Sequence, residues 1–340
     1  MIRLKAFTLQ KDGAPYTNQD RLAINIAKRR FAVADGVSNS YYPEIMAEAL
    51  CRSFIDDEAV LTVDWPSIFK ERICKKVSAY WEKEVDEIEA GLDILDLRHA
   101  KIQREEFTKG ASTFAGVEID EKEENVYFHV VGDSCVFVLP DNEPIQVYCA
   151  CPKVEYSGKP YCLFKPDTQA IVADGNDNYQ WVSGSTSMKS GYVILMTDGI
   201  AKWFQDLYFA DLGAAQMLWD TNNHVLFEEL VNKYRCQNEM DDDITVLMLR
   251  FDGGQNVGID PLVVDVWEWY PMTLIQLESA PVQIPMEKDS DISSVSDSKN
   301  APVDTEGISP EKNGIIYQFV KMLGDFKSIW ISIFGQTKSK

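Results

Sequence analysis

Short apolar runs that stop at an aspartate recur along this chain and predict strands that end in carboxylates. Residues 29–38 begin with two arginines, pass through an apolar block and reach Asp35-Gly36. The alternating run 22–26 precedes them, directly after Asp20, and residues 191–196 lead in the same way to Asp198-Gly199. A strand that ends at Asp-Gly can turn sharply and present a carboxylate at the rim of a sheet.

The middle of the chain continues this β pattern. Three runs separated by polar turns predict an antiparallel meander, namely 113–119, 126–131 and 135–139. Asp133 lies in the tight turn between the second and third runs. Residues 140–190 are rich in Pro, Gly, Asn and Ser and predict a loop-rich excursion, and 244–251 predicts the last strand of the core.

Helical periodicity separates these strands. Pro43 opens an amphipathic segment with one apolar face, formed by Ile45, Met46, Ala49, Leu50 and Phe54. A second helical region runs from about residue 64 to 107 with a break at Gly91, and a third covers about 206–236. Two long helices after a short β segment predict a layer over one sheet face.

The chain divides into four parts by composition. We expect a folded domain over 1–252, an extension over 253–286, a disordered acidic and serine-rich linker over 287–312, and an amphipathic C-terminal helix within 313–340. Residues 315–334 carry an apolar stripe interrupted by charges, so they do not predict a membrane span. Two interpretations stay open: a helix packed on this protein or free, and a helix that docks on a partner or a membrane surface.

The net charge of −21 limits the partners. Such a surface repels nucleic acids and anionic membranes, so the charge disfavours both as partners, and we expect no nucleic-acid binding. No stretch of 18 or more uninterrupted apolar residues predicts a membrane span. The 7 cysteines include no CxxC pair, which disfavours a zinc site or a disulfide framework, and the N-terminus carries no hydrophobic leader. We therefore expect a cytoplasmic protein.

Aspartates flank five of the predicted strands: Asp20, Asp35, Asp133, Asp198 and Asp242. If those strands share one sandwich, the carboxylates can gather at one edge, where only cations would relieve their repulsion. Oxygen ligands without a nearby His or Cys select Mg²⁺ or Mn²⁺. Any single one of these aspartates is as well explained by an ordinary turn.

The order of the motifs is more specific. They are Asn18-Gln19-Asp20, Ala34-Asp35-Gly36, Gly110-Ala111-Ser112-Thr113, Val131-Gly132-Asp133-Ser134, Thr197-Asp198-Gly199 and Asp242-Asp243-Ile244-Thr245-Val246. This series, over roughly residues 5–252, resembles the metal-dependent type 2C serine/threonine protein phosphatases, in a bacterial branch. The resemblance implies that residues 1–252 form a catalytic domain. It also implies an α+β fold, with a central antiparallel β-sandwich flanked by helices and a binuclear metal site at one end.

Matched motif by motif, the resemblance also implies a role for each aspartate. Asp35 would bridge two Mn²⁺ or Mg²⁺ ions, with the Gly36 carbonyl beside it, and Asp198 and Asp242 would complete the first site. Asp20 would serve the second ion, and Asp133 with Asp198 would form a weaker third site. A water that bridges the two ions would attack the phosphoester, with Asp35 and Asp198 as the catalytic carboxylates.

The sequence departs from the family pattern in three places. The phosphate-binding arginine before the first motif is missing, and Lys11 can supply the charge but not the bidentate fork. Val37-Ser38 follows Asp35-Gly36, so no histidine is available there as a general acid. Asp243 replaces the usual asparagine and adds negative charge.

The resulting hypothesis is a protein-serine/threonine phosphatase with a role in signalling, whose partners are a phosphoprotein substrate and a cognate kinase. A catalytically silent phosphatase-like domain that binds a phosphoprotein or kinase is the first alternative, motivated by the missing arginine. A small-molecule phosphoesterase, with its substrate loops in 140–190, is the second.

Overall fold

The computed structural model describes most of the first 265 residues. The described residues are 1–11, 17–57, 65–106, 110–120, 124–141, 144–148, 161–164, 169–172, 181–210, 213–236, 240, 242–253, 259–265 and 275–276. Within them, no helix is both long and apolar enough to cross a bilayer. The predicted linker and C-terminal helix, 287–340, lie outside the described residues.

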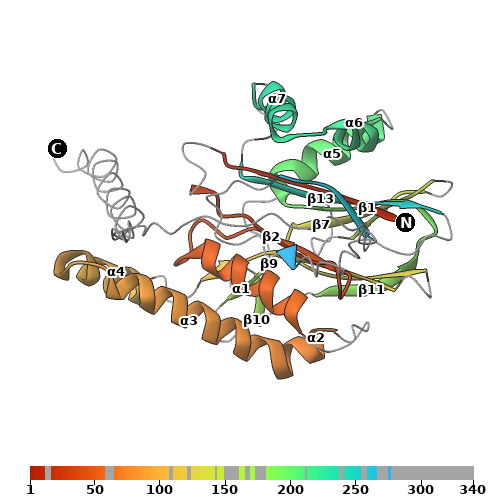
Figure 1. Ribbon diagram of the computed structural model, residues 1–340. Coiled ribbons are helices and arrows are strands. Elements are labelled where there is room, and N and C mark those ends of the chain that lie inside the picture. The colour runs from red at the N-terminus through yellow and green to blue at the C-terminus, as the bar shows by residue number, and fades with distance from the viewer. Residues whose placement is uncertain are drawn as a thin grey trace, which may run out of the picture.

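Two six-stranded sheets form the centre of the molecule (Figure 1). The first has the order β14 (Ile259–Asp265), β1 (Ile2–Leu9), β13 (Ile244–Asp252), β12 (Ser190–Met196), β7 (Cys135–Pro140) and β8 (Gln146–Tyr148). The second has the order β11 (Val182–Ser187), β6 (Asn125–Val131), β5 (Phe114–Asp120), β3 (Arg30–Ala34), β2 (Arg21–Asn25) and β15 (Ile275–Gln276). Pairing is antiparallel except at two edges, where β14 runs parallel to β1 and β15 parallel to β2.

A smaller sheet pairs β10 (Gln169–Val172), β9 (Tyr161–Phe164) and β4 (Ala111–Ser112). Helices cover the outer faces of both large sheets (Figure 1). On the first sheet lie α5 (Asp198–Ala210), α6 (Ala214–Asp220) and α7 (His224–Arg235). On the second lie α1 (Pro43–Asp56) and α3 (Cys74–Ala90). The short helix α2 (Trp65–Ile68) and a π-helical turn (Phe69–Ile73) precede α3, and α4 (Ile94–Glu106) follows it.

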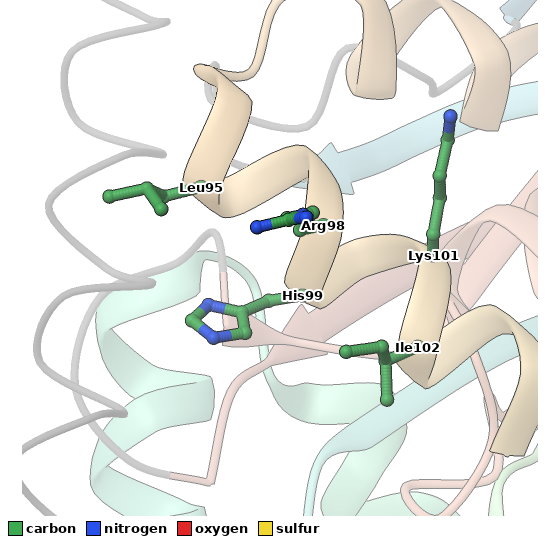
Figure 2. Close-up of a pocket in the computed structure, with 5 residues that line it drawn as sticks. All are labelled: Leu95, Arg98, His99, Lys101 and Ile102. Atoms are coloured by element: carbon green, nitrogen blue, oxygen red, sulfur yellow. The ribbon is translucent and has the colours of Figure 1, made fainter.

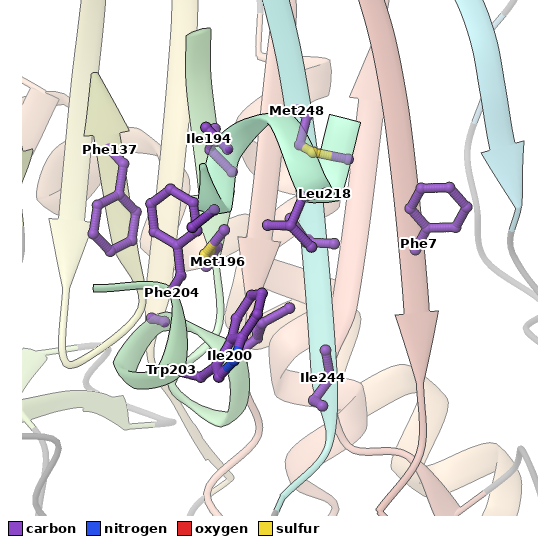
Figure 3. Packing of buried hydrophobic residues seen from close by; sticks show 14 of the residues in the cluster. Phe7, Phe137, Ile194, Met196, Ile200, Trp203, Phe204, Leu218, Ile244 and Met248 are labelled. Carbon is purple, nitrogen blue, oxygen red and sulfur yellow. The ribbon is translucent and has the colours of Figure 1, made fainter. Parts of the chain in front are cut away.

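Three apolar clusters fill the spaces between these layers. One lies between the two sheets and includes Phe31, Val130 and Leu247. Another joins the second sheet to α1 and α3. The third joins the first sheet to its helices, where strand residues such as Phe137 and Ile194 face the side chains of α5 (Figure 3). The predicted α+β class, a sandwich between helical layers, is confirmed.

Several expected elements differ in the structure. The predicted meander is wrong, because β6 and β7 belong to different sheets and the turn at Asp133 carries the chain from one to the other. The excursion 140–190 contains strands β8 to β11, and the helical stretch expected over about 206–236 consists of the end of α5, then α6 and α7. The break at Gly91 is confirmed, since α3 ends at Ala90.

Strand β14 falls within the predicted extension. It pairs with β1 from Ile2 to Phe7, with a shift of register after Leu4. The domain boundary at residue 252 stays a prediction, but the sheet that begins at residue 2 includes residues beyond that boundary.

Candidate metal centre

Three carboxylates meet where strands of both sheets end. Asp35 follows β3 of the second sheet, Asp133 lies between β6 and β7, and Asp198 follows β12 and begins α5. One carboxylate oxygen from each lies within 4.8 Å of the others, and Asp133 is buried. The edge thus collects negative charge from segments that are far apart in the chain.

Asp20 and Asp242 complete the group that the sequence predicted. Asp20 precedes β2 and is 1% exposed, whereas Asp242 is exposed, close to the start of β13. Burial raises the pKa of Asp35 well above its usual range, and the charges of Asp198, Asp20, Asp133 and Asp242 raise it further. All five carboxylates therefore lie close enough to interact electrostatically.

This arrangement is unfavourable for the protein alone. Burial, and then the charge of Asp242, raise the pKa of Asp198 to about 6. Burial and the charge of Asp243 also raise the pKa of Asp20 well above its usual range. Among the described residues, none donates a hydrogen bond to the buried Oδ1 of Asp20. Clustered oxygen ligands and a buried oxygen that accepts no hydrogen bond fit hard divalent cations such as Mn²⁺ or Mg²⁺.

Side chains at the ends of strands of the first sheet, together with Asn18, hold Asp20 in place. The Thr197 hydroxyl donates a hydrogen bond of 2.7 Å to Asp20 Oδ2 and accepts one of 2.9 Å from the backbone N–H of Thr245. Asn18 Oδ1 accepts a bond of 2.7 Å from the Asp20 amide, and Asn18 Nδ2 donates to the Thr8 hydroxyl at 2.9 Å. The Asn and Thr positions of the motifs thus orient a carboxylate.

The motif at 110–113 holds the Asp35 backbone. The Ser112 hydroxyl donates to the Asp35 carbonyl at 2.7 Å, and the Thr113 amide donates to the same oxygen at 2.9 Å. Gly36 packs against the first residue of α1, so that a Cβ placed on it would lie 2.7–2.9 Å from atoms of Pro43. Only glycine leaves room for the chain to turn here.

Comparison with known proteins assigns this arrangement to a family. The protein phosphatase 2C profile matches residues 10–233, about two thirds of the chain. The chain belongs to the protein phosphatase 2C family. The predicted resemblance and the enzyme class, a protein-serine/threonine phosphatase, are therefore confirmed. The match ends before Asp242, whose place in the site rests on its charge beside Asp198.

Solved structures similar to this phosphatase 2C chain include three named proteins, two of which are described as serine/threonine phosphatases. Stp1 from Staphylococcus aureus is 13% identical, with 74% of this chain and 96% of that chain covered and a TM-score of 0.45. PppA from Pseudomonas aeruginosa is 13% identical, with 73% and 97% covered and a TM-score of 0.47. The catalytic domain of PstP, in complex with two manganese ions, is 14% identical, with 73% and 97% covered and a TM-score of 0.43. No curated protein sequence matches the chain.

The loop after Asp35-Gly36 carries hydroxyl groups that bond to neighbouring segments. The Ala111 amide donates to the Ser40 hydroxyl at 2.9 Å, and the Val37 amide donates to the Ala111 carbonyl at 3.0 Å. The Ser38 hydroxyl donates to Gln19 Oε1 at 2.8 Å. These bonds connect the loop to β4 and to the segment that precedes Asp20.

Lys11 lies just after β1 and is exposed. Its backbone amide donates to Asp243 Oδ1 at 2.7 Å, which brings this segment to the carboxylate edge. Its role as the phosphate-binding residue stays a prediction, because residues 12–16 lie outside the described part. The sequence singled out Asp243 only for its charge, and its hydrogen-bonding role was missed because no local pattern signals a partner so far away in the chain.

Two other features lie away from this phosphatase site. A hollow along α4 is lined by Leu95, Arg98, His99, Lys101 and Ile102 (Figure 2). The described lining residues carry two positive charges, from Arg98 and Lys101, and no carboxylate. Buried His129 bonds to the Ser183 hydroxyl at 3.0 Å, and burial, with the charge of Arg30, lowers its pKa to about 3.

Proposed function

We propose that this chain hydrolyses phosphoserine or phosphothreonine esters on proteins, with two Mn²⁺ or Mg²⁺ ions held at the carboxylate edge. The observation that carries the proposal is the convergence of Asp35, Asp133 and Asp198 within 4.8 Å, at positions that match the family motifs. Family membership supports the activity, and the oxygen-only donor set supports the choice of cation.

Each carboxylate has a role that its position supports. The charges of the other four aspartates raise the pKa of Asp35, so its carboxylate lies near all of them. It would contact both ions, with the Gly36 carbonyl nearby. Asp198 and Asp242 would complete the first site, and Asp20 would serve the second. Asp133, paired with Asp198, would hold a weaker third ion.

When bound, the two ions supply an activated water as the nucleophile and neutralise the phosphoryl oxygens. The protein's own residues prepare the site for them. Asp198, with a pKa of about 6, holds a proton on its carboxylate in mildly acidic solution and releases it near neutral pH. Thr197 keeps one Asp20 oxygen engaged and leaves the other available.

For substrate recognition we propose the classes of the partners and one contact residue. We expect a phosphoprotein substrate and a cognate serine/threonine kinase that opposes the enzyme. Lys11 would contact the substrate phosphate as a point charge in place of the missing arginine. The bacterial assignment, the signalling role and the cytoplasmic location predicted from the sequence stay predictions.

The decisive experiment measures turnover of a phosphothreonine peptide with Mn²⁺, with Mg²⁺ and with EDTA. Wild type is compared with Asp198→Ala and with Asp206→Ala, a matched control on the exposed face of α5. The proposal is supported if EDTA abolishes turnover, Asp198→Ala abolishes it as well, and Asp206→Ala retains it. Absence of turnover in folded wild-type protein with either metal refutes it in favour of a silent binding domain. Faster turnover of para-nitrophenyl phosphate or nucleotides than of the peptide favours a small-molecule phosphoesterase.

A further inference from the structure

Asp243 accepts hydrogen bonds from two backbone amides that are eight residues apart. Its Oδ1 accepts from the Lys11 amide at 2.7 Å, and its Oδ2 accepts from the Gln19 amide at 2.7 Å. The residue is 9% exposed. Bonds of this length to an ionised carboxylate are among the stronger hydrogen bonds in proteins.

The two amides bound by Asp243 mark the ends of one connection. Lys11 follows β1, and Gln19 directly precedes Asp20, the residue assigned to the second ion. One side chain therefore holds both ends of the segment between β1 and β2. It holds them against the start of β13, where Asp242 lies.

Asp243 is itself fixed by its neighbours. The Asp242 carboxylate accepts a hydrogen bond of 2.9 Å from the Asp243 amide. On the other side, α5 packs so closely that a Cβ on Gly199 would overlap the Asp243 carbonyl oxygen. The carboxylate thus extends from a rigid part of the site, between Asp198 and Asp242.

An asparagine cannot make the same contacts. Its amide group has one acceptor oxygen, and its NH₂ group would face a backbone N–H, so one of the two bonds would be lost. The departure from the family pattern at this position therefore changes geometry as well as charge.

We propose that Asp243 is a positioning residue that holds the backbone of Lys11 and of Gln19 at the metal edge, and so sets the spacing of Asp20 from Asp242. It acts through the backbone of Gln19 and Lys11. The expected effect of Asp243 on catalysis rests on the proposed function. The clamp itself, meaning the two hydrogen bonds from the Lys11 and Gln19 amides to Asp243, does not.

The test compares Asp243→Asn with wild type and with Asp206→Asn, an exposed aspartate on α5 that undergoes the same chemical change. Hydrogen exchange is followed in peptides that contain the Lys11 and Gln19 amides, in metal-free protein. We expect exchange on the order of tenfold faster in Asp243→Asn, because a charge-assisted bond is lost. Calorimetric titration with Mn²⁺ should show one of two sites weakened by about tenfold.

Kinetics at saturating Mn²⁺ provide a third readout. We expect a higher KM for the phosphothreonine peptide, with kcat largely retained, since both carboxylate oxygens of Asp243 already accept backbone hydrogen bonds. Equal exchange and equal Mn²⁺ isotherms in Asp243→Asn and Asp206→Asn overturn the proposal. If Asp243→Asn does not fold, hydrogen exchange in wild type alone decides. Lys11 and Gln19 amides that exchange without protection would rule out the two hydrogen bonds to Asp243. Absent turnover in wild type refutes the proposed function and leaves the exchange result to decide the clamp.

Discussion

Replacement of Asp198 by asparagine should stabilise the metal-free protein near neutral pH while it removes one of the proposed cation ligands. The pKa of Asp198 is raised from 3.8 to about 6 by burial and by Asp242. A carboxyl with a raised pKa binds more protons when folded than when unfolded, so folding stability falls as pH rises through this window. The loss begins near pH 4 and is complete above about pH 6.

The size of the effect follows from the same shift. A change from 3.8 to about 6 corresponds to about 3 kcal/mol of lost stability at pH 7. The neutral asparagine side chain would avoid that loss but would give up the favourable charge at the N-terminus of α5, worth roughly 0.3–1 kcal/mol. The net gain of about 2 kcal/mol should raise Tm by roughly 4–8 °C in a domain of this size.

Urea unfolding, followed by tryptophan fluorescence, measures this directly. EDTA-treated wild type, Asp198→Asn and the exposed control Asp206→Asn are compared between pH 4.5 and 7.5. Saturating Mn²⁺ should then reverse the order, because a ligand that binds only the folded state stabilises it, and wild type binds it more tightly. Two results would refute the role given to the raised pKa of Asp198. One is equal stability of metal-free wild type at pH 4.5 and 7.5. The other is an Asp198→Asn protein that is less stable than wild type at pH 7.5.

Two further substitutions test the support of the site. Thr197→Val removes the hydroxyl that donates to Asp20, so it should cost about 1–3 kcal/mol in urea unfolding and weaken Mn²⁺ binding in calorimetry, whereas Thr197→Ser should retain both. A Thr197→Val protein with wild-type Mn²⁺ affinity would contradict this role. Gly36→Ala places a Cβ 2.7–2.9 Å from Pro43 and should lower both the circular-dichroism Tm and the activity. Gly91→Ala, where the only contact is at 3.4 Å, is the control, and equal Tm values would contradict the packing argument.

The aspartates were predictable because the turns that carry them are local. Asp35 and Asp198 each follow an apolar strand and precede a glycine, a pattern visible within ten residues. The hydroxyl groups around them were not predictable in the same way. Thr8 and Thr245, whose hydroxyls lie 2.8 Å apart, are separated by 237 residues, and nothing near either one indicates the other.

The sequence also did not show which of the two sheets β7 joins, and only the structure answers this. Buried positions dominate both β6 and β7, so their pattern predicts strands without showing which sheet each one joins. Strand β1 was missed although Ile2, Leu4 and Ala6 alternate with basic residues. One of those, Lys5, is buried because its amino group donates to the Thr221 carbonyl at 3.0 Å, so its charge is no guide to an exposed face.

The position of β1 has a consequence for how the protein is made. Both of its neighbours, β13 and β14, come from the far end of the domain, and Ile2 pairs with Phe251. Closure of so long a loop is entropically costly and slows folding. During synthesis the first strand must therefore wait, with both edges unpaired, until residues 244–265 have left the ribosome. Since Asp242 emerges just before β13, the last of the five clustered aspartates and the last partners of β1 arrive together. A chain interrupted before residue 242 would lack both the neighbours of β1 and a full set of carboxylates, so the proposed activity requires this late segment to have been made.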